Sequence, residues 1–366
     1  MSRNFKVALA HDHLFQLGGA ENVLQELMRC YPSAPLYTLI HHPKNFYLDP
    51  SVDVHTSFLQ KLPGGLQHFK WYLALMPMAW EQFDFSSYDI VISSASAFVK
   101  GIVTHPSTIH ISYCHSPTRY LWSDTLEYVN NLSLPAVARV PLLQLLSRLR
   151  QWDQTAAQRV DYFIANSRYV SERIKKYYRR DSTVIYPPVP IDSFSLSDTI
   201  HDYYLIVSRL RPYKRVDLAI EAFNQLKLPL VIIGGGEEMQ KLRRKARHNI
   251  TFLGEVDEQT KRKYLSRCKA FIHPQEEDFG ISAVEAMASG RPVIAYGAGG
   301  ATETIVEGLT GTLFNEQSWE ALVYAILKCD VPSFDSMAIR SHAMKFDTIV
   351  FQKQIMQFVK NAVERV

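Results

Sequence analysis

The segment AFIHPQEEDFGISAVEAMASGRPVIAYG (270–297) contains two short apolar runs on either side of a helix-length stretch. The runs AFIHP (270–274) and RPVIAYG (291–297) are predicted strands, and 281–289 is a predicted helix that ends at Gly290, with Pro292 beyond it. This strand, helix, strand order is typical of parallel sheets. The helix also contains Glu285 among small apolar residues, where a carboxylate costs free energy unless it is hydrogen-bonded.

The same alternation of short apolar strands and helices runs along the whole chain, in two series. The first series has predicted strands at 5–10, 88–94, 109–115, 160–167 and 182–189. The second has them at 203–210, 228–236, 250–254, 270–274 and 291–297. The fold class is therefore α/β, with parallel sheets covered by helices on both faces.

A Pro-rich segment (186–202) separates the two series and is interpreted as a linker. We expect an N-terminal Rossmann-like domain over 1–188, a second over 189–347, and a final helix over 348–366. Two doubly wound domains of this kind should face a central cleft, with ligands at the carboxyl ends of the strands.

Composition excludes several classes of protein. The chain has 366 residues, 47% of them hydrophobic and 21% charged, which is typical of a globular protein. A net charge of +4 is too small to indicate nucleic-acid binding. The four cysteines form no CxxC pair, so a reducing cytosol is expected. No signal peptide and no run of 18 apolar residues is present, so we expect a cytoplasmic protein, free or peripheral on the inner face of the bacterial plasma membrane.

Four cations crowd the loop between a strand and a helix in SRLRPYKRVDLAIEAF (208–223): Arg209, Arg211, Lys214 and Arg215. Positive charge at a helix N-terminus is locally unfavourable. A bound anion would account for it, and a solvated basic loop is the alternative.

Gly18-Gly19 and His115 each follow a predicted strand, and each has a ligand-binding and a structural interpretation. Gly18 and Gly19 allow a ligand close to the start of a helix, or form a plain turn. His115 in YCHSPTRYLW (113–122) ends a strand, where it contacts a sugar hydroxyl or is a structural histidine.

At the predicted helix start, the backbone N–H groups of Phe279, Gly280 and Ile281 are suited to hydroxyl or phosphate oxygens. Glu285 is placed to accept hydrogen bonds from the vicinal hydroxyls of a ribose, and Glu277 to reach a sugar ring. No DxD or HExxH motif occurs, so we expect no metal.

These motifs together resemble the retaining glycosyltransferases of family 4, which have the GT-B fold. The resemblance rests on the spacing of Glu277 and Glu285 and on a series of motifs in the family's order: LGGAENVL (17–24), YCHSPTRYLW, ANSRYV (165–170), SRLRPYKRVD, GGGEE (234–238) and EGLTGTLF (307–314). Among bacterial members, the chain is most similar to GDP-mannose-dependent mannosyltransferases of surface-polysaccharide and O-antigen assembly.

The resemblance implies roles for individual residues. Arg209 and Lys214 would bind the donor diphosphate, Glu277 and His115 the donor sugar, and Glu285 the ribose. The remaining donor-side residues would be Gly18, Gly19, Phe279, Gly280, Ile281, Gly299, Gly300 and Glu303. Arg119 and Asn166 would lie on the acceptor or sugar side, and the C-terminal helix would pack on the first domain.

The implied reaction is metal-independent transfer of a hexose with retention, by front-face displacement and without a protein nucleophile. The implied donor is GDP-mannose, with UDP- or dTDP-sugars left open, and no other cofactor is expected. The implied acceptor is a glycan or polyprenyl-linked oligosaccharide. Basic amphipathic stretches at 62–80 and 134–152 are suited to an anionic membrane, or else pack on the protein's own core.

Three other functions remain open on the sequence. A Rossmann-type oxidoreductase shares the strand and helix pattern, but no strand is followed by GxGxxG. A GT-B nucleotide-sugar epimerase and a non-catalytic nucleotide-sugar sensor are the other two.

Overall fold

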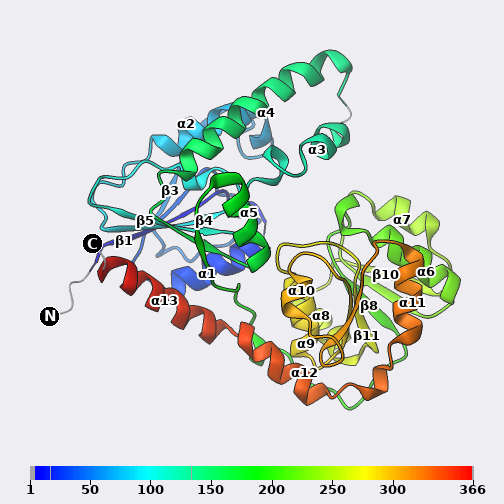
Figure 1. Cartoon of the computed structure of the whole chain (residues 1–366). Coiled ribbons are helices and arrows are strands. Elements are labelled where there is room, and N and C mark those ends of the chain that lie inside the picture. Colours follow the sequence, from blue (N-terminus) through cyan, green and yellow to red (C-terminus); the bar gives the residue numbers. More distant parts are fainter. Residues whose placement is uncertain (1–4, 17, 133, 365–366) are drawn as a thin grey trace. The chain divides into compact units, whose positions relative to one another are not determined.

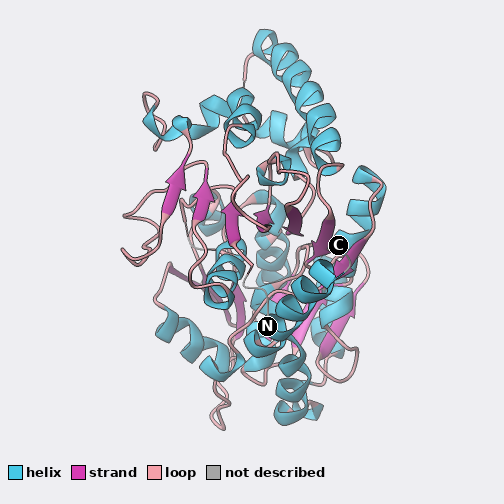
Figure 2. Ribbon diagram, turned by 90° about the vertical axis from the view of Figure 1, so that its left-hand side faces the viewer, coloured by secondary structure: helices cyan, strands magenta, loops and turns pink. Residues whose placement is uncertain are grey.

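The computed structural model describes residues 5–364 apart from 17 and 133. The chain divides into two compact units (Figure 1). Unit 1 comprises Met1–Tyr186 and Phe351–Val366, and unit 2 comprises Pro187–Val350. The predicted fold class is confirmed, because each unit contains one parallel sheet flanked by helices (Figure 2).

The sheet of unit 1 contains seven parallel strands within the described residues, in the order β3-β2-β1-β4-β5-β6-β7. They are β1 (Val7–His11), β2 (Leu36–Thr38), β3 (Val54–Thr56), β4 (Ile90–Ala95), β5 (Ile109–Cys114), β6 (Tyr162–Ala165) and β7 (Ser182–Val184). The order reverses between β1 and β4, so the topological switch point of this unit lies there.

Helices cover both faces of this sheet because successive strand residues point to opposite faces. Leu9 packs with α1 (Gly19–Cys30) and α13 (Thr348–Glu364) on one face. Ala8 and Ala10 pack with α2 (Met76–Glu81) and α4 (Ala136–Ala157) on the other. α3 (Thr125–Asn131) and α5 (Arg168–Tyr178) complete the larger helices of unit 1.

The final helix α13 belongs to unit 1 from Phe351 onward. Its buried residues Phe351, Ile355 and Val359 lie in the same core cluster as α1. The last segment of the chain therefore completes the core of the first unit, as Figure 1 shows by the red helix beside α1.

The sheet of unit 2 has six parallel strands in the described chain, in the order β10-β9-β8-β11-β12-β13. They are β8 (Tyr204–Val207), β9 (Leu230–Ile233), β10 (Ile250–Gly254), β11 (Ala270–His273), β12 (Val293–Tyr296) and β13 (Gly311–Phe314). The order reverses between β8 and β11, which places the switch point of unit 2 between the cationic loop and the Glu277 loop.

The helices of unit 2 follow its strands in turn. They are α6 (Val216–Leu226), α7 (Met239–Lys245), α8 (Glu258–Arg267), α9 (Ile281–Ala288), α10 (Ala301–Thr304), α11 (Trp319–Lys328) and α12 (Ser336–Ala343). α9 packs on β11 and β12 and contacts α8 and α12. It begins at the predicted residue and ends one residue before the predicted end, with Gly290 at φ +69° just beyond.

The structure differs from the sequence prediction in two ways. β2, β3 and β13 were not predicted as strands, because runs of three or four residues carry little periodic signal. The strand predicted over 182–189 ends at Val184, since Pro187 and Pro188 have no N–H group to donate to a sheet.

Candidate functional site

The switch point of unit 2 brings together two of the predicted donor-site residues. Lys214 lies in the loop after β8, and Glu277 lies in the loop after β11. The Nζ of Lys214 and the Oε1 of Glu277 form an ion pair, with about one sixth of each side chain exposed (16% and 17%). Arg209 leaves the end of the same strand as Lys214 and is exposed. A cation and a carboxylate therefore face each other where open α/β sheets bind ligands.

Gly280 starts α9 for a steric reason. Its φ of +90° is strained for residues with a Cβ, and a Cβ there would lie 3.2 Å from the Nε2 of His273. Phe279, just before it, has a buried side chain whose ring is 5.4 Å from that of Phe346. Phe279 can thus face a ligand only through its backbone, as the sequence predicted, and Ile281 is the first residue of the helix.

Gly299 and Gly300 lie directly against the Glu277 turn. The N–H of Gly300 donates to the carbonyl oxygen of Glu277 at 2.8 Å. A Cβ on Gly299 would lie only 2.2 Å from that same oxygen, so no larger residue fits. Glu303 follows on α10, where its N–H donates to the carbonyl of Gly300. The structure thus joins the predicted glycine-rich loop to the predicted sugar-binding glutamate.

Glu285 has a protein partner that sequence reasoning missed. Lys261 on α8 places its Nζ 3.0 Å from the Oε1 of Glu285 and 3.0 Å from the Oε1 of Glu258. Burial raises the pKa of Glu285, and the Lys261 ammonium partly offsets that shift. Burial lowers the pKa of Lys261, but the two carboxylates outweigh it and raise that pKa overall.

The sequence indicated ribose hydroxyls as partners for this buried carboxylate, and the structure shows that Lys261 pairs with it within the protein. Its role toward a ribose stays a prediction. Lys261 could not be singled out beforehand, because EQTKRKYLSR (258–267) contains four similar cations.

Two buried residues behind Glu277 were also missed. His273 ends β11 and Gln275 follows two residues later, each at most 2% exposed. The Nε2 of Gln275 lies 3.2 Å from the Nδ1 of His273 and 3.4 Å from the Oε1 of Glu277. Burial lowers the pKa of His273 to about 3, and the nearby Lys214 charge acts in the same direction. In the sequence, the polar side chains at every second position (273, 275 and 277) were the only indication that these residues lie together.

In unit 1, Gly18 and Gly19 open helix α1 as predicted, while the neighbouring Leu17 of the quoted motif is outside the described residues. Gly18 has φ −160°, an extended conformation open to any residue, so its backbone does not require glycine. The close approach of a ligand to this pair stays a prediction, and a plain turn is the alternative.

His115 follows β5 and hydrogen-bonds through Nε2 to the Ser94 hydroxyl at 2.8 Å. Part of its surface is exposed, but protein surrounds most of the ring. Burial lowers its pKa to about 3, and His11 adds a smaller effect in the same direction. His115 is therefore a neutral hydrogen-bonding group near neutral pH.

The two residues predicted on the acceptor side also belong to unit 1. Arg119 begins a 3₁₀ turn, and its Nη1 lies 3.9 Å from the Oδ2 of Asp124. Asn166 follows β6, is 6% exposed and accepts a hydrogen bond from the Ser167 hydroxyl at 3.2 Å. Nothing in these contacts tests their predicted role.

Asp12 is the residue of unit 1 whose position sequence reasoning missed. Its two oxygens accept four backbone N–H groups from residues 96–99 at 2.6–2.8 Å. The loop after β4 is thereby fastened to the end of β1, across the switch point. The sequence shows the HDH motif (11–13), but it does not show that Asp12 binds backbone amides more than 80 residues away.

The comparisons with known proteins agree with this geometry. The family model described as "Glycosyltransferase Family 4" matches residues 17–193, and that described as "Glycosyl transferases group 1" matches residues 192–329. The two models follow one another along the chain and meet near the boundary between the two units. The chain belongs to the family 4 glycosyltransferases.

Curated relatives of this glycosyltransferase include mannosyltransferases. The alpha-1,3/1,6-mannosyltransferase ALG2 of Dictyostelium discoideum is 24% identical, over 86% of this chain and 87% of its own length. The O-antigen chain mannosyltransferase C of Escherichia coli is 30% identical, over 49% of each chain.

Among solved structures, Anabaena HepE in complex with UDP and glucose has a TM-score of 0.72 at 19% identity. The match covers 98% of this chain and 100% of HepE. Sucrose-phosphate synthase from Thermosynechococcus elongatus has a TM-score of 0.71 at 17% identity, over 99% of this chain and 100% of its own. At these identities the likeness establishes the GT-B fold.

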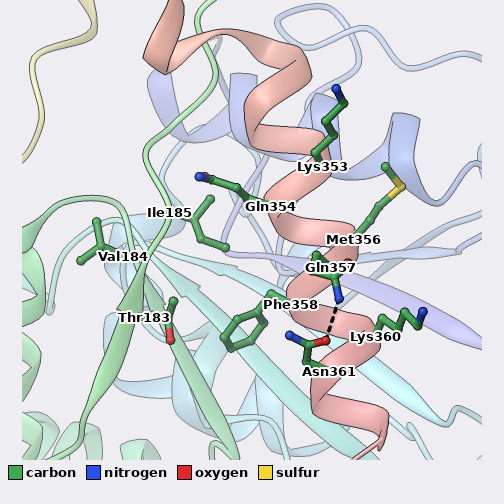
Figure 3. Close-up of a pocket in the computed structure, with 10 residues that line it drawn as sticks. All are labelled: Thr183, Val184, Ile185, Lys353, Gln354, Met356, Gln357, Phe358, Lys360 and Asn361. Atoms are coloured by element: carbon green, nitrogen blue, oxygen red, sulfur yellow. Dashed lines mark hydrogen bonds between the residues drawn. The ribbon is translucent and has the colours of Figure 1, made fainter.

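Unit 1 of the glycosyltransferase contains a groove of about 730 Å³ between β7 and α13, and none of the predicted site residues lines it (Figure 3). Its lining includes Lys353, Lys360 and Phe358, and Gln357 donates to the Oδ1 of Asn361 at 2.7 Å. The lining contains no carboxylate and no histidine. It therefore lacks the carboxylates and the histidine that the predicted donor site contains.

No described helix is both long and apolar enough to cross a membrane. No group of three or more His, Cys, Asp or Glu side chains in the described chain could hold a metal ion. Metal independence stays a prediction.

Proposed function

We propose that this glycosyltransferase transfers mannose from GDP-mannose to a glycan or lipid-linked glycan, with retention of the anomeric configuration and without a metal. The pairing of Lys214 with Glu277 at the switch point of unit 2 carries the proposal. The names of the relatives, ALG2 and O-antigen chain mannosyltransferase C, support mannose as the sugar.

Each part of the site then has a physical role. Arg209 and Lys214 neutralise the diphosphate as it leaves, which lowers the barrier by charge stabilisation. Glu277 accepts hydrogen bonds from hydroxyls of the donor sugar, and Glu285 from the ribose. Reaction then depends on positioning, since family resemblance implies no protein nucleophile.

A thermal-shift screen against GDP-, UDP-, dTDP- and ADP-sugars tests the donor. A ligand that binds only the folded state raises stability by RT ln(1 + [L]/Kd), so the correct nucleotide gives the largest shift. We expect GDP-mannose to lead. A larger shift with UDP-glucose would favour a uridine donor, for which the UDP and glucose in the HepE complex are the precedent.

A turnover assay with the donor that the screen selects separates transfer from the other functions. With donor and a polyprenyl-linked oligosaccharide, a transferase releases nucleoside diphosphate in proportion to extended acceptor. An epimerase converts the donor without acceptor, and a sensor binds the donor and releases nothing. The one-bond coupling constant between C1 and H1 of the transferred mannose shows whether the anomeric configuration is retained.

The exposed surface of unit 1 supports a lipid-linked acceptor. On α4, Val137 and Val140 are 82% and 59% exposed, whereas Leu146 and Leu149 pack into the core. The second half of the 134–152 stretch is therefore core-packed, and only its first half is available to a membrane. Trp71 is 74% exposed in the other basic stretch. The stretches 62–80 and 134–152 contain no Asp or Glu, so no negative charge within them would repel an anionic membrane.

Sedimentation with phosphatidylglycerol vesicles tests this attachment. We expect binding at low salt that weakens at high salt, and that weakens further in a Val137→Ser, Val140→Ser variant. A Met356→Ser variant on α13 is the matched control, since Met356 is also exposed (47%) but lies outside this surface. Equal sedimentation with neutral and anionic vesicles would contradict the proposal.

A further inference from the structure

His273 and Gln275 are two buried polar residues that have no role in the proposed reaction so far. They are 1% and 2% exposed, and with Glu277 they occupy alternate positions along the chain. A buried polar side chain is stabilising only when its hydrogen bonds are made.

The hydrogen bonds of Gln275 connect His273 to Glu277. Its amide nitrogen carries two hydrogens and lies 3.2 Å from the Nδ1 of His273 and 3.4 Å from the Oε1 of Glu277. Donation to both requires Nδ1 to be an acceptor, so the proton of the neutral ring is on Nε2. The depressed pKa of His273 keeps that ring neutral across the physiological range.

The arrangement is poor for stability. Neither the Nε2 of His273 nor the Oε1 of Gln275 has a hydrogen-bond partner among the described residues. Leaving two buried polar atoms unsatisfied costs more than an apolar pair of similar shape would. Packing alone therefore does not account for this polar pair.

Lys214 and Gln275 contact the same oxygen of Glu277, its Oε1. When a diphosphate engages Lys214, as the proposed function requires, the carboxylate loses part of its cationic partner. The Gln275 amide contacts His273 and Glu277, and in this account it stays with Glu277 when Lys214 moves. It is therefore suited to hold the carboxylate while Lys214 changes partner.

We propose that His273 and Gln275 are positioning residues that hold the Glu277 carboxylate in the orientation that receives the donor sugar. This inference rests on the proposed role of Glu277 in donor binding. His273 acts through Gln275, whose amide it orients, and neither residue touches the substrate.

The test compares four variants in calorimetric titrations with GDP and with GDP-mannose; UDP and UDP-glucose replace them if the thermal shifts select uridine. The ratio of the two dissociation constants isolates the contribution of the sugar. Glu277→Gln, Gln275→Leu and His273→Leu should each reduce that contribution about tenfold, the effect of one hydrogen bond to a charged group. In the two leucine variants the Kd of GDP should stay within about twofold, because Lys214 keeps its Glu277 partner and neither replaced residue contacts the nucleotide in this proposal.

His273→Asn is the matched control. The asparagine oxygen lies near the position of Nδ1 and accepts the Gln275 hydrogen bond, so the sugar contribution should return to within about threefold of the wild type. A merely structural role would instead weaken GDP and GDP-mannose equally and lower the melting temperature.

The outcomes separate this inference from the proposed function. If Glu277→Gln leaves the sugar contribution unchanged, the donor role of Glu277 is wrong and the positioning role falls with it. If Glu277→Gln lowers it and both leucine variants do not, the positioning role alone is overturned. Equal losses for GDP and GDP-mannose in both leucine variants overturn it too.

Discussion

At the scale of single residues, the ion pair between Lys214 and Glu277 determines what the site can do. The two side chains come from loops after neighbouring strands and form an ion pair with each other. In the proposed function, a diphosphate draws Lys214 toward itself, and this frees the carboxylate for sugar hydroxyls. The proposed function therefore has Lys214 and Glu277 separate when the donor binds.

Replacing Lys214 with alanine should raise the barrier to transfer by about 2–4 kcal/mol, similar to the loss of one oxyanion donor. Turnover should fall far more than acceptor affinity, because the lysine stabilises charge that develops on the leaving diphosphate. Steady-state kinetics with both substrates measures this. Lys245→Ala, which removes an exposed lysine from α7, should leave turnover unchanged. Near-normal turnover of Lys214→Ala would remove this residue from the mechanism.

At the scale of elements, helices α8 and α9 are joined by one ion pair. Lys261 on α8 offsets the burial of Glu285 on α9. Because burial raises the pKa of Glu285, the folded protein keeps that proton to higher pH than the unfolded chain. This carboxyl therefore lowers the free energy of unfolding as pH rises from about 4.5 through its folded pKa.

Lys261→Met should reduce the free energy of unfolding at neutral pH by about 2 kcal/mol, because the buried carboxylate loses its cation. The loss should shrink as pH falls toward 4.5, where Glu285 becomes protonated. Urea unfolding at several pH values measures both effects. Glu258→Gln removes the other carboxylate on Lys261, which is 62% exposed, and should cost less than about 1 kcal/mol. A loss independent of pH would contradict this account.

At the scale of the whole molecule, each unit has its own core. Ile220 lies in the core of unit 2, and Phe351 of α13 lies in that of unit 1. We therefore expect scanning calorimetry to resolve two unfolding transitions. GDP at 100 times its Kd should stabilise the unit 2 transition by about 2.7 kcal/mol.

Core variants assign the two transitions. Ile220→Ala should lower the nucleotide-sensitive transition, by about 2–5 kcal/mol in stability, and Phe351→Ala should lower the other by about 3–5 kcal/mol. AMP in place of GDP should shift neither. One transition that both variants lower together would show that the units unfold as a single cooperative body.

The sequence by itself determined the local features of this protein. Apolar runs, glycines and prolines act on their near neighbours, so they predicted two parallel α/β sheets, the start of α9 and a cationic loop after β8. The motif order also indicated family 4. The strands β2, β3 and β13 were not predicted, because three or four residues are too few to show a hydrophobic period.

Only the tertiary structure decided which polar groups meet. Lys261 reaches Glu285 from another helix, Asp12 holds the amides of residues 96–99, and Lys214 meets Glu277 from across a switch point. These partners lie 24 to more than 80 positions apart in the chain. Their distances are set by how helices and strands pack, and side-chain charge alone does not specify that packing.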